Sequence, residues 1–112
     1  MYKLNFAKHF QEDVKSTINY IKNTLQAPVA SKRLKDEIRK TYKDLKQNPF
    51  MYPVVPDTDL ASMGFRFIMI KNFMLFYIVE EKQINIIRFL YGRRNWINIL
   101  KETIIDSDIN FQ

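Results

Sequence analysis

The chain has 112 residues, which suffice for one domain with a single core of modest size. Hydrophobic residues make up 46% of the sequence, so a chain that is disordered throughout is excluded. Cysteine is absent, which excludes disulfide bonds and thiol catalysis. Because the sequence shows no internal repeat and no linker, we expect residues 1–112 to form a single domain.

The balance of 18 basic and 12 acidic residues gives a net charge of +6 at neutral pH. Such an excess attracts polyanions, whether RNA, DNA or an acidic protein, and charge alone does not choose among them. The N-terminal residues lack the apolar core of a secretion signal, and no apolar run approaches the roughly 20 residues of a membrane span. We therefore expect a cytoplasmic protein without a membrane partner.

The first half of the sequence predicts a strand followed by two helices. Apolar and polar residues alternate over residues 2–6, as in a half-buried strand. From residue 8 the apolar side chains recur every three or four positions, which predicts a helix of about five turns. Its buried stripe consists of Phe10, Val14, Ile18, Ile21 and Leu25. Pro28 is placed to begin a second helix that ends before Pro49. Two amphipathic helices with a short connection predict an antiparallel hairpin covering one face of a sheet.

The exposed side of the second helix is rich in basic residues: Lys32, Arg33, Lys35, Arg39, Lys40, Lys43 and Lys46. Such a face is more often a solvated surface than a binding site. Residues 49–63 hold three of the four prolines and are predicted to form an irregular loop. In this loop Asp57 or Asp59 is a candidate general base or, in the interpretation that we favour, the ion-pair partner of an arginine.

Three strands are predicted over residues 65–70, 73–79 and 84–91, because β-branched and aromatic side chains fill them almost without interruption. The middle one is apolar on both alternating faces, which predicts a central strand covered on both sides. Alternation places Arg66 on a face with Ile68 and Ile70. In the last strand it predicts two opposite faces, one with Ile84, Ile86, Arg88 and Leu90, the other with Ile87, Phe89 and Tyr91. An arginine on an apolar face needs a carboxylate, a rim position or an anionic ligand.

Apolar residues at helical spacing after residue 97 predict a short C-terminal helix that packs back on the sheet. The acidic end, about residues 106–112, is a candidate mobile segment. The whole order is β-α-α-β-β-β. It predicts an α+β fold with a small, twisted, mainly antiparallel sheet packed by the N-terminal helical hairpin.

The most distinctive pattern is Arg-x-x-Tyr-Gly-x-Arg at residues 88–94, preceded by Gly64-Phe65-Arg66 and by the aromatic middle strand. With these segments the sequence resembles, over roughly residues 2–100, the RelE/ParE family of bacterial toxins from type II toxin–antitoxin modules. The resemblance implies a cognate antitoxin, of which an acidic, partly disordered segment wraps the toxin. Such a segment suits a chain of charge +6.

Resemblance to the RelE branch implies a metal-independent endonuclease that cuts messenger RNA on the ribosome, with the RNA 2′-hydroxyl as nucleophile. By this analogy Arg66 and Arg94 clamp the scissile phosphate, and Tyr91 stacks on a base or takes part in proton transfer. Lys71, Arg88 and Arg93 are then the nucleic-acid-binding residues, with a purely structural role as the alternative for Arg88. Guanidinium groups suit this task because they present planar donors to phosphate and stabilise its developing charge.

Two residues depart from the RelE pattern, since Met74 and Leu100 stand where that branch commonly has an arginine and a tyrosine. The ParE branch offers a second interpretation, because its members share the scaffold and the Gly-Arg-Arg region but poison DNA gyrase and do not cut RNA. A basic nucleic-acid-binding module without toxicity is the third. Tyr91 beside Arg93 and Arg94 favours RNA cleavage. No metal or other cofactor is expected, because His9 is the only histidine and no carboxylate spacing is typical of a metal site.

Overall fold

The computed structural model describes residues 1–105, so the predicted mobile end, 106–112, lies outside the described residues. The elements are β1 (Lys3–Phe6), α1 (Lys8–Asn19), the π-helical turn η1 (Tyr20–Thr24), α2 (Pro28–Gln47), α3 (Thr58–Ser62), β2 (Arg66–Ile70), β3 (Phe73–Glu80), β4 (Gln83–Tyr91) and α4 (Trp96–Ile105). This order confirms the predicted α+β fold and adds two elements to it, η1 and α3.

The four strands form one sheet in the order β1-β4-β3-β2. β1 runs parallel to β4, while β4, β3 and β2 pair antiparallel, which confirms the mainly antiparallel sheet. β3 lies between two neighbours, as its apolar sequence predicted. Its side chains reach both faces, because Leu75 and Tyr77 join the core on one side while Met74 and Phe76 join the core on the other.

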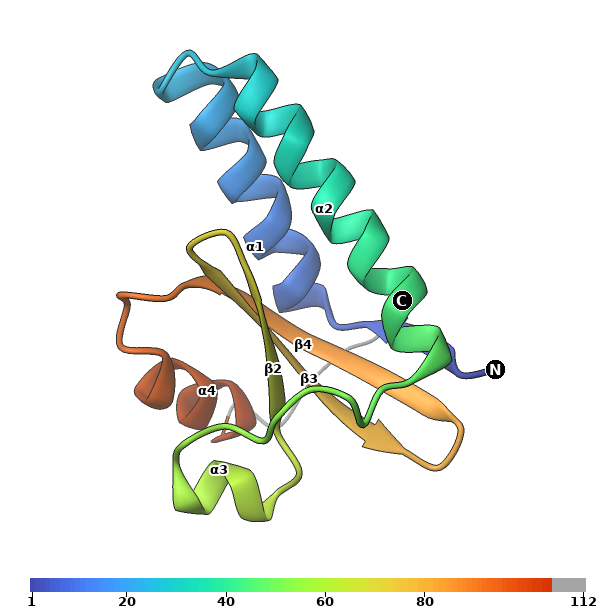
Figure 1. The fold of residues 1–112 in the computed structure, drawn as a ribbon. Helices are drawn as coiled ribbons and strands as arrows, with labels where there is room; N and C mark the ends of the chain where they lie inside the picture. Colours follow the sequence, from blue (N-terminus) through green and yellow to red (C-terminus); the bar gives the residue numbers. More distant parts are fainter. Residues whose placement is uncertain (106–112) are drawn as a thin grey trace.

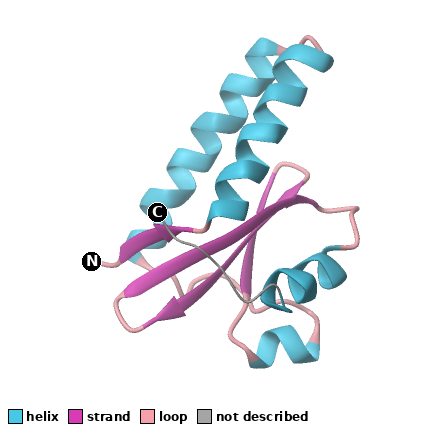
Figure 2. Cartoon of the chain, turned by 180° about the vertical axis from the view of Figure 1, so that it is seen from behind, coloured by secondary structure: helices cyan, strands magenta, loops and turns pink. Residues whose placement is uncertain are grey.

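The helices form separate layers on the two faces of the sheet. α1 and α2 make the antiparallel hairpin on one face and extend beyond the sheet, while α3 and α4 lie at the other face (Figure 1). The view from behind shows the same division (Figure 2). Phe10, Leu34 and Ile38 of the hairpin pack against the sheet, and Leu100 of α4 packs on the opposite side, so the predicted C-terminal helix is confirmed.

The predicted faces of the last strand were wrong beyond Ile86, because β4 contains a bulge. Phe76 pairs with Arg88 and Tyr77 pairs with Ile86, which leaves Ile87 as an extra residue. One extra residue reverses the alternation of side chains that follow it. Phe89 therefore packs with Ile86 on the hairpin side, whereas Leu90 packs with Ile87 on the α4 side.

The first helix also departs from its predicted stripe at its end. In η1 the amide of Leu25 donates to the carbonyl of Tyr20, five residues earlier, at 3.0 Å. Bonds of this span widen the turn, so the four-residue step from Ile21 no longer returns to the same face. Leu25, which we predicted to be buried, is instead 55% exposed.

The loop after α2 is more regular than predicted, because it contains α3. The carboxylate of Asp57 accepts the amide hydrogen of Leu60 at 3.0 Å and so caps this helix. Asp59 forms an exposed contact of 3.4 Å with Lys101. Neither aspartate pairs with an arginine, so the favoured interpretation of these two residues was wrong. Within residues 1–105, no helix has both the length and the apolar character needed to cross a membrane.

Candidate functional site

The turn between β2 and β3 brings together several of the residues singled out from the sequence. Lys71 and Asn72 form the turn, and Lys71 has a left-handed backbone with φ 57°. The amide of Gly92 donates to the carbonyl of Asn72 at 2.8 Å, which fixes the exit of β4 against this turn. A Cβ atom at Gly92 would lie 3.2 Å from that carbonyl oxygen, so a residue without a side chain suits this close approach.

A shallow pocket of about 250 Å³ lies beside the turn, lined by Met69, Asn72, Met74, Tyr91, Gly92 and Arg93. Tyr91 is the last residue of β4 and is 38% exposed, with its ring edge-on to Phe73 at 5.7 Å. The amide of Arg94 donates to the carbonyl of Tyr91 at 3.0 Å, which turns the chain sharply. The turn, Tyr91 and the two arginines after it thus occupy one end of the sheet.

Arg66 lies elsewhere on the sheet. It pairs with Tyr77, whereas Tyr91 pairs with Phe73, so the two positions are four residues apart along β3, roughly 13 Å. The Arg66 guanidinium donates to the carbonyl of Tyr52 and lies over the Phe50 ring at 5.2 Å from its centroid. Its environment is therefore the loop before α3.

Arg88 is held in a buried network that joins three elements. Its Nε and Nη2 atoms donate to the Asp13 carboxylate of α1 at 2.7 and 2.9 Å, and its Nη1 donates to Thr103 of α4 at 2.9 Å. Asp13 also accepts the amide hydrogen of Phe89 at 3.0 Å. The side chains of Arg88 and Asp13 are each only 14% exposed. The guanidinium is thus committed to internal partners.

The structure therefore brings Lys71, Tyr91 and Arg93 together, with Arg94 adjacent in sequence, and separates them from Arg66 and Arg88. The catalytic and nucleic-acid-binding roles taken from the RelE resemblance stay predictions. Among residues 1–105, no group of three or more histidine, aspartate or glutamate side chains is arranged to hold a metal ion.

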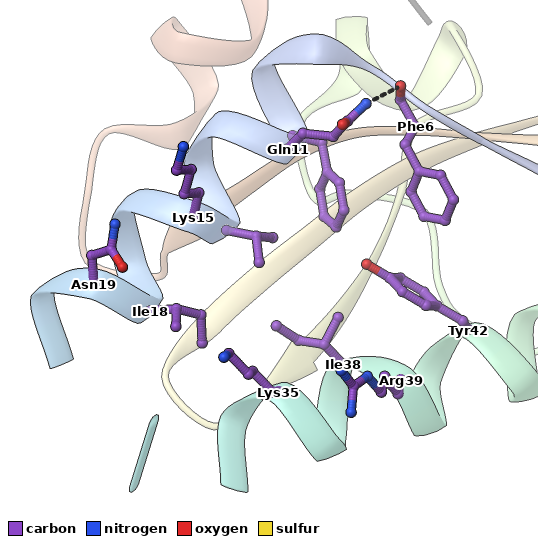
Figure 3. A pocket seen from close by; sticks show the side chains of 11 residues that line it. Phe6, Gln11, Lys15, Ile18, Asn19, Lys35, Ile38, Arg39 and Tyr42 are labelled. Atoms are coloured by element: carbon purple, nitrogen blue, oxygen red, sulfur yellow. Dashed lines mark hydrogen bonds between the residues drawn. The ribbon is translucent and has the colours of Figure 1, made fainter. Parts of the chain in front are cut away.

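A larger concave site lies between α1 and α2, and the sequence interpretation missed it. This interhelical groove encloses about 570 Å³ and is lined by Phe6, Phe10, Gln11, Val14, Lys15, Ile18, Asn19, Lys35, Ile38, Arg39 and Tyr42 (Figure 3). Apolar side chains form its floor. Figure 3 shows Lys15 on α1, and Lys35 and Arg39 on α2, around its mouth. An apolar floor with a basic rim suits an amphipathic, acidic segment.

Polar groups inside the interhelical groove are few and neutral. The Gln11 side-chain amide donates to the carbonyl of Phe6 at 3.2 Å (Figure 3). Tyr42 packs edge-on against Phe6 at 5.1 Å, and its hydroxyl points into the groove. Burial raises the pKa of Tyr42 to about 12, although the nearby Arg39 guanidinium opposes the rise. The hydroxyl is therefore protonated at neutral pH and available as a hydrogen-bond donor.

Helical spacing contained a signal for this groove. Lys35 and Arg39 are four residues apart on α2, as are Ile38 and Tyr42, and on α1 Gln11 and Lys15 repeat the same interval. Each series forms a row along its helix. What the sequence did not show is how the two rows face each other, because that depends on the crossing of the helices.

Comparison with known proteins agrees with this fold. A family model described as the ParE toxin of the type II toxin-antitoxin system, parDE, matches residues 4–96. No curated protein matches the sequence significantly. Among solved structures, a chain of the chromosomal ParDE TA system from P. aeruginosa is similar, with a TM-score of 0.65 and 19% identity. The match covers 81% of this chain and 96% of that chain. Since the family model spans most of the sequence, the chain belongs to the ParE toxin family of type II toxin–antitoxin systems.

Proposed function

We propose that this chain is a toxin that inhibits DNA gyrase and is neutralised by a cognate antitoxin. The observation that carries the proposal is the match of the ParE family model to residues 4–96. The geometry agrees with it, because Arg66 lies roughly 13 Å along the sheet from Tyr91 and is engaged by the loop carbonyl of Tyr52. A phosphate clamp for RNA cleavage requires its guanidinium groups at one point. The ParE alternative is thus favoured over messenger RNA cleavage.

A supercoiling assay with purified gyrase tests the proposed target. We expect the purified chain to block supercoiling of relaxed plasmid and to increase the fraction of cleaved DNA. In parallel, translating ribosomes with a labelled messenger RNA should yield no toxin-dependent fragments. Ribosome-dependent fragments with unaffected gyrase would overturn the proposal in favour of the endonuclease. A folded chain without either effect would favour the non-toxic nucleic-acid-binding module.

The interhelical groove is the proposed seat of the antitoxin. Its floor of Phe10, Val14 and Ile38 offers apolar surface to the buried face of a docking segment, and its rim of Lys15, Lys35 and Arg39 offers charge to acidic side chains. Fixed opposite charges at a rim mainly increase the association rate and exclude wrong partners. An acidic segment therefore gains both affinity and specificity there.

Co-purification with the product of the adjacent reading frame tests this docking site. Reversing the rim charge with Lys35→Glu and Arg39→Glu should weaken the complex by tenfold or more, measured by calorimetric titration. The control is Lys40→Glu with Lys43→Glu, which changes the net charge equally on the same helix but outside the groove lining. Equal weakening by both pairs would contradict a docking site in the groove.

A further inference from the structure

A third concave site joins the helical hairpin to the β2–β3 turn. This pocket encloses about 280 Å³ and is lined by Ile21, Ala30, Arg33, Leu34, Lys71 and Phe73. Its two cations come from different elements, since Arg33 lies on α2 and Lys71 lies in the turn. The remaining lining is apolar. Figure 1 shows the β2–β3 turn reaching up beside the hairpin.

Positive charge continues across the turn to its other side. Arg93 lines the pocket beside Met69 and Met74, and the bond from the Gly92 amide to the Asn72 carbonyl holds that strand exit against the turn. Neither pocket has an acidic residue in its lining. Over the described residues 1–105, no ion pair engages Arg33, Lys71 or Arg93. The donors of all three side chains are therefore available to an external anion.

We propose that Arg33, Lys71 and Arg93 form a site for the phosphodiester backbone of a nucleic acid. Arginine presents a planar fork of donors that matches phosphate, and lysine adds a point charge. The apolar floor of Leu34 and Phe73 lies beside the cations, where it excludes water and accepts the carbon atoms of a sugar. Because the cations flank both sides of one turn, they suit an extended ligand with repeated charges better than a single small anion.

The site is separate from the interhelical groove. The two linings share no residue, and the groove uses Lys35 and Arg39 from α2 where the turn site uses Arg33. Of the basic residues on α2, only Arg33 lines a pocket together with a cation from the sheet. This inference concerns a ligand of the toxin and does not depend on gyrase being its target.

Fluorescence anisotropy over a range of salt concentrations tests the site, with a short labelled DNA duplex and a single-stranded RNA as separate probes. Each lost phosphate contact lowers the slope of log K against log salt by about 0.9 for duplex DNA and by about 0.7 for a single strand. Arg33→Gln with Lys71→Gln should therefore lower the slope for duplex DNA by about 2, and weaken binding tenfold or more. Comparing the two probes shows which nucleic acid the site prefers.

The charge-matched control is Lys3→Gln with Lys82→Gln at the opposite end of the sheet, where Lys3 pairs with Gln83. Each double variant lowers the net charge from +6 to +4. We expect the control to keep the slope of the unmodified chain. Equal losses in the two double variants would overturn the site, because they would indicate diffuse attraction to a basic body.

A second pair of variants separates binding from folding. Lys71 and Glu81 both occupy left-handed turn positions, with φ 57° and 55°, where glycine is tolerated. Lys71→Gly should lower the slope for duplex DNA by about 1, whereas Glu81→Gly should not lower it. An unchanged slope in Lys71→Gly would overturn the role of this lysine.

An oligoglutamate peptide serves as the competing ligand class. If Arg33→Gln with Lys71→Gln lost oligoglutamate binding but kept both nucleic-acid slopes, the site would take an acidic protein segment and the proposal would be wrong. Gyrase supercoiling is measured separately with the same variants. Loss of nucleic-acid binding with intact gyrase inhibition leaves the site in place, and an unmodified chain that spares gyrase refutes only the proposed target.

Discussion

The carboxylate of Asp13 accepts three hydrogen bonds, two from the Arg88 guanidinium and one from the Phe89 amide. Removing one member of a buried ion pair leaves the other charge without compensation. We expect Asp13→Ala to lower the free energy of unfolding by about 3 kcal/mol, measured by urea denaturation. The control is Asp36→Ala, whose contact with Arg39 is long and exposed, at 3.9 Å, and which should cost at most about 0.5 kcal/mol.

A double variant distinguishes the cost of an unpaired charge from the value of the pair itself. Asp13→Leu combined with Arg88→Met removes both charges and keeps apolar volume, so it should destabilise the protein less than Asp13→Ala alone. If Asp13→Ala costs no more than Asp36→Ala, Arg88 is not the structural hub that its contacts indicate. The sequence showed that an arginine in this strand needed compensation. It did not show which acid supplies it, because Asp13 is 75 residues away along the chain.

Lys71 and Glu81 each hold a left-handed backbone in a two-residue hairpin turn. This conformation costs a residue with a Cβ atom about 1–2 kcal/mol, whereas glycine adopts it freely. Glycine also gains freedom in the unfolded chain, which offsets part of the benefit. We expect Lys71→Gly and Glu81→Gly each to raise the free energy of unfolding by about 0.5 kcal/mol, seen as a higher urea midpoint. A lower midpoint in either variant would show that its side chain stabilises the turn.

The elements themselves were largely predictable, because period two and period 3.6 are direct consequences of backbone geometry. The two irregularities were not. The bulge at Ile87 and the wide turn η1 each insert one residue into a regular pattern, and a local sequence that fits both registers does not reveal the insertion. Both change which side chains face the core: Phe89 moves to the hairpin side, and Leu25 becomes exposed.

The packing of Tyr42 between α1 and α2 predicts a pH dependence of stability. Burial raises its pKa from 10.0 to about 12, so between these values the unfolded chain loses this proton before the folded chain does. The contribution of Tyr42 to stability is therefore complete below pH 10 and is lost as the pH rises towards 12. Urea midpoints measured from pH 8 to 12 should fall less steeply for Tyr42→Phe than for the unmodified chain. Burial also raises the pKa of Tyr77, so part of the decline remains. Parallel curves would contradict this assignment.

For the whole molecule, the sequence predicted the fold class, the hairpin layer and the basic end of the sheet near the β2–β3 turn. It did not predict which arginines share that end. Arg66 and Arg94 were grouped by a family analogy, and the strand register separates Arg66 from Tyr91 by four positions along β3. The interhelical groove escaped notice for a related reason. A basic helix face appears uniformly solvated until a second helix places an apolar floor beside it.

Two sites that share no residue should respond independently to substitution. Lys35→Gln with Arg39→Gln changes the groove rim, and Arg33→Gln with Lys71→Gln changes the turn site; both lower the net charge from +6 to +4. We expect the groove pair to lose antitoxin affinity by about tenfold and to keep the salt slope for duplex DNA. The turn pair should lose about 2 from that slope and keep antitoxin affinity.

Calorimetric titration with the antitoxin and anisotropy with the duplex measure the two quantities on the same preparations. Since the net charge is equal in both variants, a crossed pattern of losses can only come from the location of the removed charges. If each variant instead lost both activities to the same degree, the charges on α2 and the turn would act as one field, and the division of the basic surface into two sites would be wrong.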